Sequence, residues 1–134
     1  MCLFCKIING EIPCKKVYES NSSIAFLDIS PVSKGHCLVL PKKHYDNYLL
    51  MPENEICEYQ KDIHIVCKKI NELLNPNGIN ILTNINESAG QTVMHTHFHI
   101  IPRYDNNDMI KIEFGKSIEC DIDNIHTLLK KDIQ

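Results

Sequence analysis

The sequence predicts an α+β fold, with an antiparallel sheet of about five strands, one long helix and a short C-terminal helix. Two observations predict it. Short segments rich in apolar and β-branched residues recur between turn-forming residues. One much longer segment carries apolar residues at helical spacing. Because the links between strands are short, we expect antiparallel neighbours, with the helices on one side of the sheet.

The first half of the chain predicts a short helical turn over residues 4–8, followed by three strands. Ser-Asn-Ser separates the first two strands, which resemble a hairpin, and a loop bracketed by Pro31 and Gly35 precedes the third. Proline has no amide hydrogen to donate, so we expect Pro41 to end the third strand. These strands are predicted at residues 16–19, 24–28 and 36–40.

The second half predicts the long helix at residues 53–74, where apolar residues recur every three or four positions. Pro52 lies near its start, and the Asn-Pro-Asn-Gly sequence at 75–78 ends it. We expect a last helix with Asp123 as its N-cap. Its inward-facing residues are predicted to be Ile125, Leu128 and Leu129. Two further strands are predicted at residues 79–83 and 95–101, the second ended by Pro102.

Composition predicts a single domain and excludes several classes of protein. The chain has 134 residues, 43% of them hydrophobic, which is enough for a core without metals or disulfides. A net charge of −3 argues against a nucleic-acid surface, although local dipoles would still bind small anions. No secretory or membrane-spanning segment is present in the sequence. We therefore expect a cytoplasmic protein.

The seven cysteines are an odd number, which favours reduced thiols over a disulfide framework. Cys37 lies in a strand-like segment, and Cys57 and Cys67 lie in the helical pattern. We expect these three to be small buried hydrophobic residues. The isolated histidines His64 and His126 are interpreted as ordinary surface or core residues.

Three histidines at a spacing of two, His95, His97 and His99, are the strongest functional signal. In an extended strand alternate residues share a face, so the three imidazoles would lie on one side, about 6.6 to 6.8 Å apart. Two chemistries fit this arrangement: metal ligands, or a nucleophile with acid–base partners. The Gly-Gln-Thr loop at 90–92 offers groups that bind phosphate oxygens, which favours attack on phosphorus.

Several segments resemble the histidine-triad (HIT) family of nucleotide-binding proteins. The resemblance covers residues 2 to about 104 in the family's order, so we expect one HIT domain over 1–134, with 105–134 as a C-terminal extension containing a short helix. It implies an α+β HIT fold, usually paired as a homodimer across the long helix and a sheet edge. The segments that carry it are residues 2–8, 11–13, 28–31, 35–44 and 89–103.

The resemblance implies a hydrolase or transferase acting on nucleoside monophosphate groups. Substrates in the family include adenosine phosphoramidates, aminoacyl-adenylates and dinucleoside polyphosphates, so we expect a purine nucleotide. His97 matches the family's nucleophile, which forms a nucleotidyl-histidine that water then hydrolyses. His99 would hold an α-phosphate oxygen, while His95 and His36 would set the tautomer and charge of the cluster. Histidine at position 99 favours the hydrolase branch, because uridylyltransferases have glutamine there.

The resemblance also implies a nucleoside site. Asp28 would hold the ribose hydroxyls, although an aspartate here could simply cap the turn before Pro31. Asn84 would lie near the ribose and phosphate, and Gln91 near the leaving group. The expected substrate-binding residues are Phe26, Leu27, Asp28, Ile29, Asn84, Gly90, Gln91, Thr92 and Val93.

Cys2 and Cys5 form a Cys-x-x-Cys pair, which is a plausible half of a tetrahedral zinc site. By resemblance, His44 and His95 would complete it. Such a site would fix His95 and keep its two neighbours in the triad aimed at phosphate. The alternative is two ordinary reduced cysteines and a surface histidine.

Two other functions use the same residues. One is a nucleotide-binding regulatory or scaffold protein with little turnover. The other is a metal-dependent enzyme with His95, His97 and His99 as ligands, but the sequence lacks the carboxylate that such sites commonly add. No nucleic-acid or membrane partner is expected.

Overall fold

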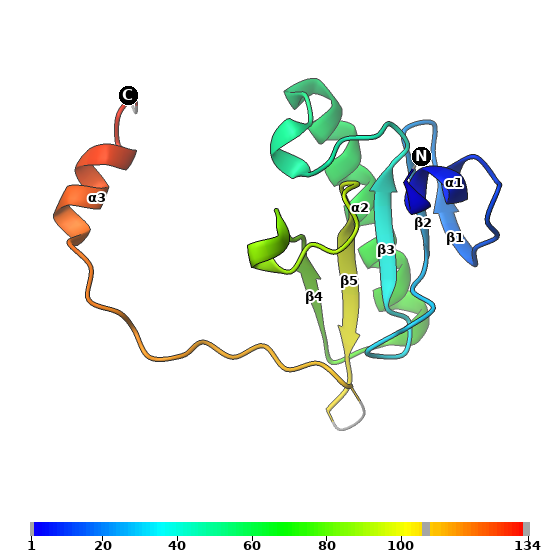
Figure 1. The fold of residues 1–134 in the computed structure, drawn as a ribbon. Helices are drawn as coiled ribbons and strands as arrows, with labels where there is room; N and C mark the ends of the chain where they lie inside the picture. The colour runs from blue at the N-terminus through cyan, green and yellow to red at the C-terminus, as the bar shows by residue number, and fades with distance from the viewer. Residues whose placement is uncertain (1, 106–107, 133–134) are drawn as a thin grey trace.

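The computed structural model describes residues 2–105 and 108–132, and its body is one antiparallel sheet with a helix on each face (Figure 1). The sheet has five strands in the order β1-β2-β3-β5-β4, and every neighbouring pair is antiparallel. This confirms the predicted α+β class. The strands are β1 (Lys16–Glu19), β2 (Ser23–Leu27), β3 (Cys37–Pro41), β4 (Gly78–Leu82) and β5 (Phe98–Arg103).

Helix α2, Glu53–Leu74, has the bounds that the sequence predicts. Pro52 is its N-cap, and Asn75 ends it in the left-handed conformation, with φ 49°. Its apolar stripe packs on one face of the sheet, where each buried side chain stabilises the fold by about 1.5–3 kcal/mol. The buried residues of this core are Ala25, Cys37, Val39, Met51, Tyr59, Ile63, Val66, Ile70 and Ile100.

Helix α1, Leu3–Ile8, covers the opposite face of the sheet. Its Phe4 is buried against a second apolar cluster from β2 and β3. The expectation that the helices share one side is therefore wrong. Residues 23–26 and all of β3 are buried, so both faces of these strands need cover. The second cluster contains Phe4, Ile24, Phe26, Leu38 and Leu40.

The triad segment does not form a single strand, contrary to the prediction for residues 95–101. Strand β5 begins at Phe98, so His95 and His97 precede it and only His99 lies within it. A contact from another part of the chain holds the segment that leads into β5. The carbonyl of Tyr45 accepts hydrogen bonds from the amide and the hydroxyl of Thr96, at 2.7 and 3.0 Å. The segment therefore cannot join the sheet ladder until after His97.

Pro41 is the last residue of β3, as predicted, whereas β5 continues one residue past Pro102, to Arg103. Pairing between β3 and β5 stops at the Cys37–Ile100 pair. No β3 residue therefore lies opposite Pro102, and its missing amide hydrogen leaves no bond to β3 unmade.

Helix α3, Ile122–Leu129, begins two residues earlier than predicted, because Asp121 and not Asp123 is its N-cap. Its apolar side chains do not turn inward, because α3 stands away from the body at the end of an extended segment (Figure 1). Two short 3-10 helices complete the structure, Tyr48–Leu50 and Glu87–Ala89.

All seven cysteines are free, and Cys37 is buried as predicted. Cys57 is exposed, which contradicts its predicted burial, because it lies on the solvent side of α2. Cys67 is half-buried. Among the described residues, no helix is long and apolar enough to span a bilayer.

Candidate functional site

A cavity of about 280 Å³ lies between α1, the end of β2 and the segment that leads into β5. It brings together eight of the residues predicted for the site: Phe26, Leu27, Asp28, Ile29, Thr92, Val93, His97 and His99. Most of the lining side chains are apolar, and the two imidazoles are among the few polar ones. Such a concave site with a few convergent polar groups is typical of small-ligand pockets.

One nitrogen of His97 is available to the cavity. Its Nδ1 lies 2.7 Å from the backbone carbonyl of His95. A carbonyl only accepts, so Nδ1 carries the hydrogen and donates it, which leaves the lone pair of the neutral ring on Nε2. Burial lowers the pKa of His97, although the His95 carbonyl and Asp28 act in the opposite direction. The ring is therefore neutral and nucleophilic at neutral pH.

A second chain of hydrogen bonds fixes the tautomer of His99. The amide of Val32 donates to Nδ1 of His36, at 3.2 Å, so His36 carries its hydrogen on Nε2. That nitrogen lies 2.9 Å from Nδ1 of His99 and donates to it. His99 must then carry its own hydrogen on Nε2. His99 therefore offers an N–H donor near the lone pair of His97. The centroids of these two rings are 5.2 Å apart.

Burial also keeps the hydrogen-bonded pair of His36 and His99, here called the relay, uncharged. It lowers the pKa of His36, which the nearby Asp28 only partly offsets. For His99, burial together with the neighbouring imidazoles of His97 and His36 lowers the pKa to about 4. Two neutral rings can share one hydrogen bond, as observed.

Asp28 caps a turn and also lines the cavity. Its Oδ1 accepts from the amide of Ser30 at 2.8 Å, which caps the turn after β2. Its Oδ2 lies 3.7 Å from Nε2 of His36, and the residue lines the cavity. One carboxylate oxygen is therefore committed to the turn, while the other is near the histidines.

The structure does not bring Gln91, Asn84 or Gly90 to the cavity wall. Gln91 is 1% exposed, and its side-chain amide forms hydrogen bonds with backbone groups. It accepts from the amide of Asn86 at 2.8 Å and donates to the carbonyls of Asp46 and Val93. Asn84 donates to the carbonyl of Gly90 at 3.4 Å. These residues shape the loop that presents its next two residues, 92 and 93, to the cavity.

Sequence reasoning missed the contribution of α1 to the site. Phe4 packs edge-on against His97, with ring centroids 5.0 Å apart, and also against His95. The two apolar residues between the cysteines of the Cys-x-x-Cys pair, Leu3 and Phe4, were the available signal. The cavity residues that the sequence did not single out are Leu3, Phe4, Ile7, Ile12, Pro13, Cys14 and Leu38.

Four potential metal ligands meet beside the cavity: Cys2, Cys5, His44 and His95. Both thiol sulfurs lie 3.4–3.5 Å from Nδ1 of each imidazole, and the two Nδ1 atoms are 3.1 Å apart. Nε2 of His95 donates to the carbonyl of Pro41, which leaves the Nδ1 lone pair facing the cluster. His95 therefore belongs to this cluster, whereas the other two triad imidazoles line the cavity.

His44 presents the same atom to the cluster. Its Nε2 lies 2.8 Å from a carboxylate oxygen of Asp46, which can only accept at neutral pH, so Nδ1 carries the lone pair. Two lone pairs and two thiols thus converge on one point. Tetrahedral zinc with these ligands needs neighbouring donor atoms about 3.3–3.8 Å apart. The four sulfur–nitrogen separations of 3.4–3.5 Å lie in this range, and the two Nδ1 atoms, 3.1 Å apart, are slightly closer.

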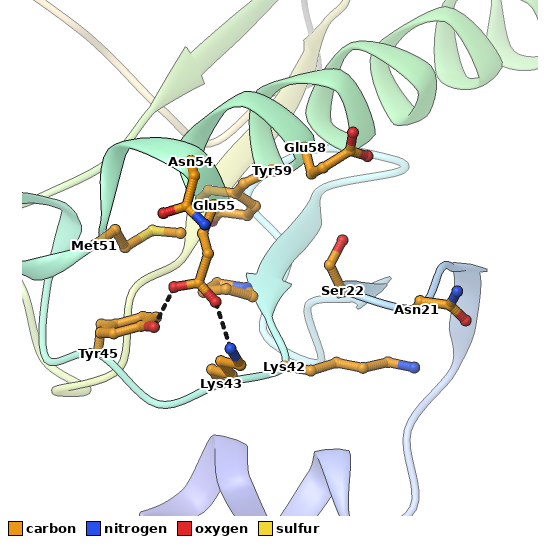
Figure 2. A pocket seen from close by; sticks show the side chains of 11 residues that line it. Asn21, Ser22, Lys42, Lys43, Tyr45, Met51, Asn54, Glu55, Glu58 and Tyr59 are labelled. Atoms are coloured by element: carbon orange, nitrogen blue, oxygen red, sulfur yellow. Dashed lines mark hydrogen bonds and ion pairs between the residues drawn. The ribbon is translucent and has the colours of Figure 1, made fainter.

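A second cavity, of about 310 Å³, lies at the N-terminal end of α2 (Figure 2). Figure 2 shows Glu55 reaching toward Lys43 and Tyr45. It forms an ion pair with Lys43 at 2.8 Å and accepts a hydrogen bond from the Tyr45 hydroxyl. Its carboxylate is thus already neutralised, and no histidine or cysteine lines this cavity. The chemistry of the molecule is therefore concentrated at the cavity beneath α1.

Solved structures of other proteins share this fold over most or nearly all of the chain. A crystal structure of a HIT family member from Bacillus subtilis has a TM-score of 0.92 and 39% identity, covering 99% of this chain and 97% of that one. A HIT family protein from Bacillus anthracis has a TM-score of 0.89 and 38% identity, with the same coverage. A HIT-like protein from Bartonella henselae covers 78% of this chain and 80% of its own, with a TM-score of 0.76 and 37% identity.

Sequence comparison gives the same relationship. The chain is 48% identical to an uncharacterised HIT-like protein of Methanocaldococcus jannaschii, over 93% of this chain and 95% of that protein. It is 46% identical to an adenosine 5'-monophosphoramidase of Schizosaccharomyces pombe, over 76% of this chain and 74% of that protein. The HIT domain family matches residues 9–106. With its triad imidazoles, its fold and these relatives, this chain belongs to the HIT family, whose members include nucleotide-binding proteins and hydrolases.

Proposed function

We propose that this protein is a nucleotidyl hydrolase that acts at the α-phosphate of purine nucleoside derivatives. The observation that carries the proposal is the arrangement of two imidazoles that line the cavity: a neutral His97 with its free lone pair on Nε2, next to a His99 that carries a hydrogen on Nε2. A nucleophile beside a donor is the pairing that attack on a phosphoryl group requires.

In the first step, Nε2 of His97 forms a bond to the α-phosphorus as the bond to the leaving group breaks. The non-bridging oxygens keep their negative charge, which the Nε2–H of His99 stabilises. The amides of Thr92 and Val93 make no hydrogen bond within the part of the chain that the structure describes, and they border the same cavity. In the second step, water displaces His97 and releases the mononucleotide.

The nucleoside would lie along the rest of the cavity. Oδ2 of Asp28 would accept from the ribose hydroxyls, since its other oxygen caps the turn. Charge-assisted hydrogen bonds of this kind contribute about 1.5–3 kcal/mol. Phe26, Leu27 and Ile29 would contact the base. Asn84, Gly90 and Gln91 would act indirectly by holding the loop, rather than by touching the nucleotide.

The cysteine–histidine cluster is proposed to hold a structural zinc ion, with Cys2, Cys5, His44 and His95 as ligands. All four positions of a tetrahedral ion are then filled by protein, so the ion supplies cross-linking rather than catalysis. It would join α1 to the segment before β5. His95 is thereby fixed, and its carbonyl holds His97 in the required tautomer.

The assembly and location of the protein are also proposed. We infer a cytoplasmic homodimer, paired across the long helix α2 and a sheet edge. The free state of all seven cysteines is compatible with a reducing compartment. The edge strand β4 exposes Ile81, which is 52% accessible and would be covered by such pairing.

The test is release of AMP from adenosine phosphoramidate by three proteins: the wild type, His97→Ala and His64→Ala. His64 is an exposed histidine of α2, so its variant controls for the loss of an imidazole as such. We expect His97→Ala to lose at least a hundredfold in kcat, while the control keeps wild-type activity. An active His97→Ala would remove this residue as the nucleophile.

A regulatory or scaffold protein is the competing function, because the same cavity would bind nucleotide without turning it over. Calorimetric titration with AMP separates the two. Tight binding to wild type and to His97→Ala, with no product from either, would favour the scaffold. Turnover by the wild type would exclude it.

A further inference from the structure

Two adjacent backbone carbonyls hold the loop that leads to the triad histidines. The carbonyl of Tyr45 accepts from the amide and the hydroxyl of Thr96, at 2.7 and 3.0 Å. The carbonyl of Asp46 accepts from the side-chain amide of Gln91 at 2.6 Å. Thr96 and Gln91 are both buried, where hydrogen bonds are stronger than at the surface. The two carbonyls therefore hold both ends of the segment 91–96.

The bond to Tyr45 also sets the direction of the carbonyl that orients the nucleophile. The amide hydrogen of Thr96 and the carbonyl of His95 belong to one planar trans peptide group, so they point in opposite directions. That carbonyl accepts from Nδ1 of His97 at 2.7 Å. Holding the amide hydrogen toward Tyr45 therefore holds the carbonyl toward the His97 ring, and the lone pair of that ring stays on Nε2.

The side chain of Tyr45 is in turn held at both of its ends. Its ring is half-buried and packs against the core beneath α2. Its hydroxyl donates to Glu55 in the first turn of α2, as Figure 2 shows. The other oxygen of Glu55 pairs with Lys43, but the Lys43 side chain is 74% exposed, and ion pairs in water contribute little. The main effect of Glu55 is therefore to attach Tyr45 to α2.

A separate attachment limits how much depends on Glu55. His44, the residue before Tyr45, belongs to the cysteine–histidine cluster. Loss of the contact between Glu55 and Tyr45 would therefore loosen the Tyr45 carbonyl without detaching this part of the chain. The expected effect on the histidines is partial.

We propose that Glu55 is a positioning residue for the nucleophile, acting through Tyr45 and the peptide group that precedes Thr96. The second cavity, which holds no catalytic group of its own, thereby contributes to the reaction through its wall. The inference rests on the proposed function, since it concerns the residue assigned as its nucleophile. Its structural part, the hold on the Thr96 amide, is measurable without any substrate.

The experiment compares the wild type with Glu55→Ala, Glu55→Gln and Glu58→Ala. The glutamine retains an oxygen that accepts from the Tyr45 hydroxyl but loses the charge that pairs with Lys43. Glu58 is an exposed residue of the same cavity, and Figure 2 shows its carboxylate directed away from Tyr45, so its variant controls for the loss of a carboxylate. Two quantities are measured: hydrogen exchange of the Thr96 amide by NMR, and steady-state AMP release from adenosine phosphoramidate.

We expect the Thr96 amide of Glu55→Ala to exchange about tenfold faster than in the wild type, while the amides of β3 keep their rates. We expect kcat to fall about tenfold. KM should change much less, because the proposed nucleoside contacts lie elsewhere. Glu55→Gln should restore most of both quantities, and Glu58→Ala should match the wild type.

An unchanged exchange rate of the Thr96 amide in Glu55→Ala would overturn the proposal. So would an increase shared by the amides of β3, which would reflect a general loss of stability, or an unchanged kcat in an active enzyme. A Glu55→Gln as impaired as Glu55→Ala would assign the effect to Lys43 and exclude the route through Tyr45. A wild type that releases no AMP would refute the proposed hydrolase instead, and the exchange rates would still decide whether Glu55 holds the peptide group.

Discussion

At the scale of single residues, backbone groups decide what each histidine does. The carbonyl of His95 accepts a hydrogen bond from His97. The amide of Val32 donates to His36, which in turn donates to His99. A sequence pattern does not contain these contacts. It identified the three imidazoles, but only the structure shows which nitrogen of each ring is available.

His36 is a positioning residue, and His36→Ala tests it. The change removes the ring N–H that fixes His99, so the donor beside His97 is no longer held in its reactive tautomer. We expect kcat to fall about a hundredfold, within the range for lost acid–base groups. KM should change much less, because the nucleoside contacts remain.

The measurement is steady-state AMP release from adenosine phosphoramidate, with the unfolding midpoint as a check on folding. A purely structural role for His36 would lower stability and leave kcat per folded molecule unchanged. That result would contradict the claim that His36 fixes the tautomer of His99.

At the scale of elements, the local sequence pattern was sufficient to predict the bounds of some helices and strands and insufficient for others. Helix α2 and strand β1 have their predicted bounds, because amphipathic spacing and flanking turn residues specify them locally. Strand β5 starts three residues late because Thr96 is held by Tyr45, about fifty residues away in sequence. Gln91 was expected at the leaving group but lies away from the cavity wall, and one of the groups that hold it, the carbonyl of Asp46, likewise comes from a distant loop.

Asp62 links α2 to the β1–β2 hairpin. It is 3% exposed, and its carboxylate accepts from the hydroxyls of Tyr18 and Ser20 at 2.8 Å, and from Ser22 at 3.2 Å. Replacing it by alanine leaves these hydroxyls without their acceptor. We expect Asp62→Ala to lower the free energy of unfolding by about 2–3 kcal/mol. Urea denaturation at pH 7 measures this.

The same carboxyl predicts a pH dependence. Burial raises the pKa of Asp62, but the hydroxyl donors outweigh it and the net pKa is lowered. A lowered pKa means that its stabilisation is present above about pH 4, the unfolded value, and is lost as the pH falls through the folded pKa. The stability difference between wild type and Asp62→Asn should therefore shrink between pH 5 and about pH 3. A difference that stays constant over this range would show that the ionised form is not what binds the hairpin.

At the scale of the whole molecule, the cysteine–histidine cluster joins three segments that are far apart in the sequence. We expect about one equivalent of zinc per chain in the wild type and in Cys57→Ser, a control at an exposed cysteine, and far less in Cys5→Ser. Removing zinc with a chelator should lower the unfolding temperature by several degrees, because metal binding energy is folding energy. Elemental analysis decides the point: less than a tenth of an equivalent in the wild type would exclude the zinc site.

The central claim is that hydrolysis proceeds by two displacements at phosphorus, the first by His97. The most direct measurement is the stereochemical course with an adenosine substrate that is chiral at the α-phosphorus. Each in-line displacement inverts the configuration, so two steps predict a product with net retention. Net inversion would mean that water attacks the substrate directly, and His97 would not be a nucleophile.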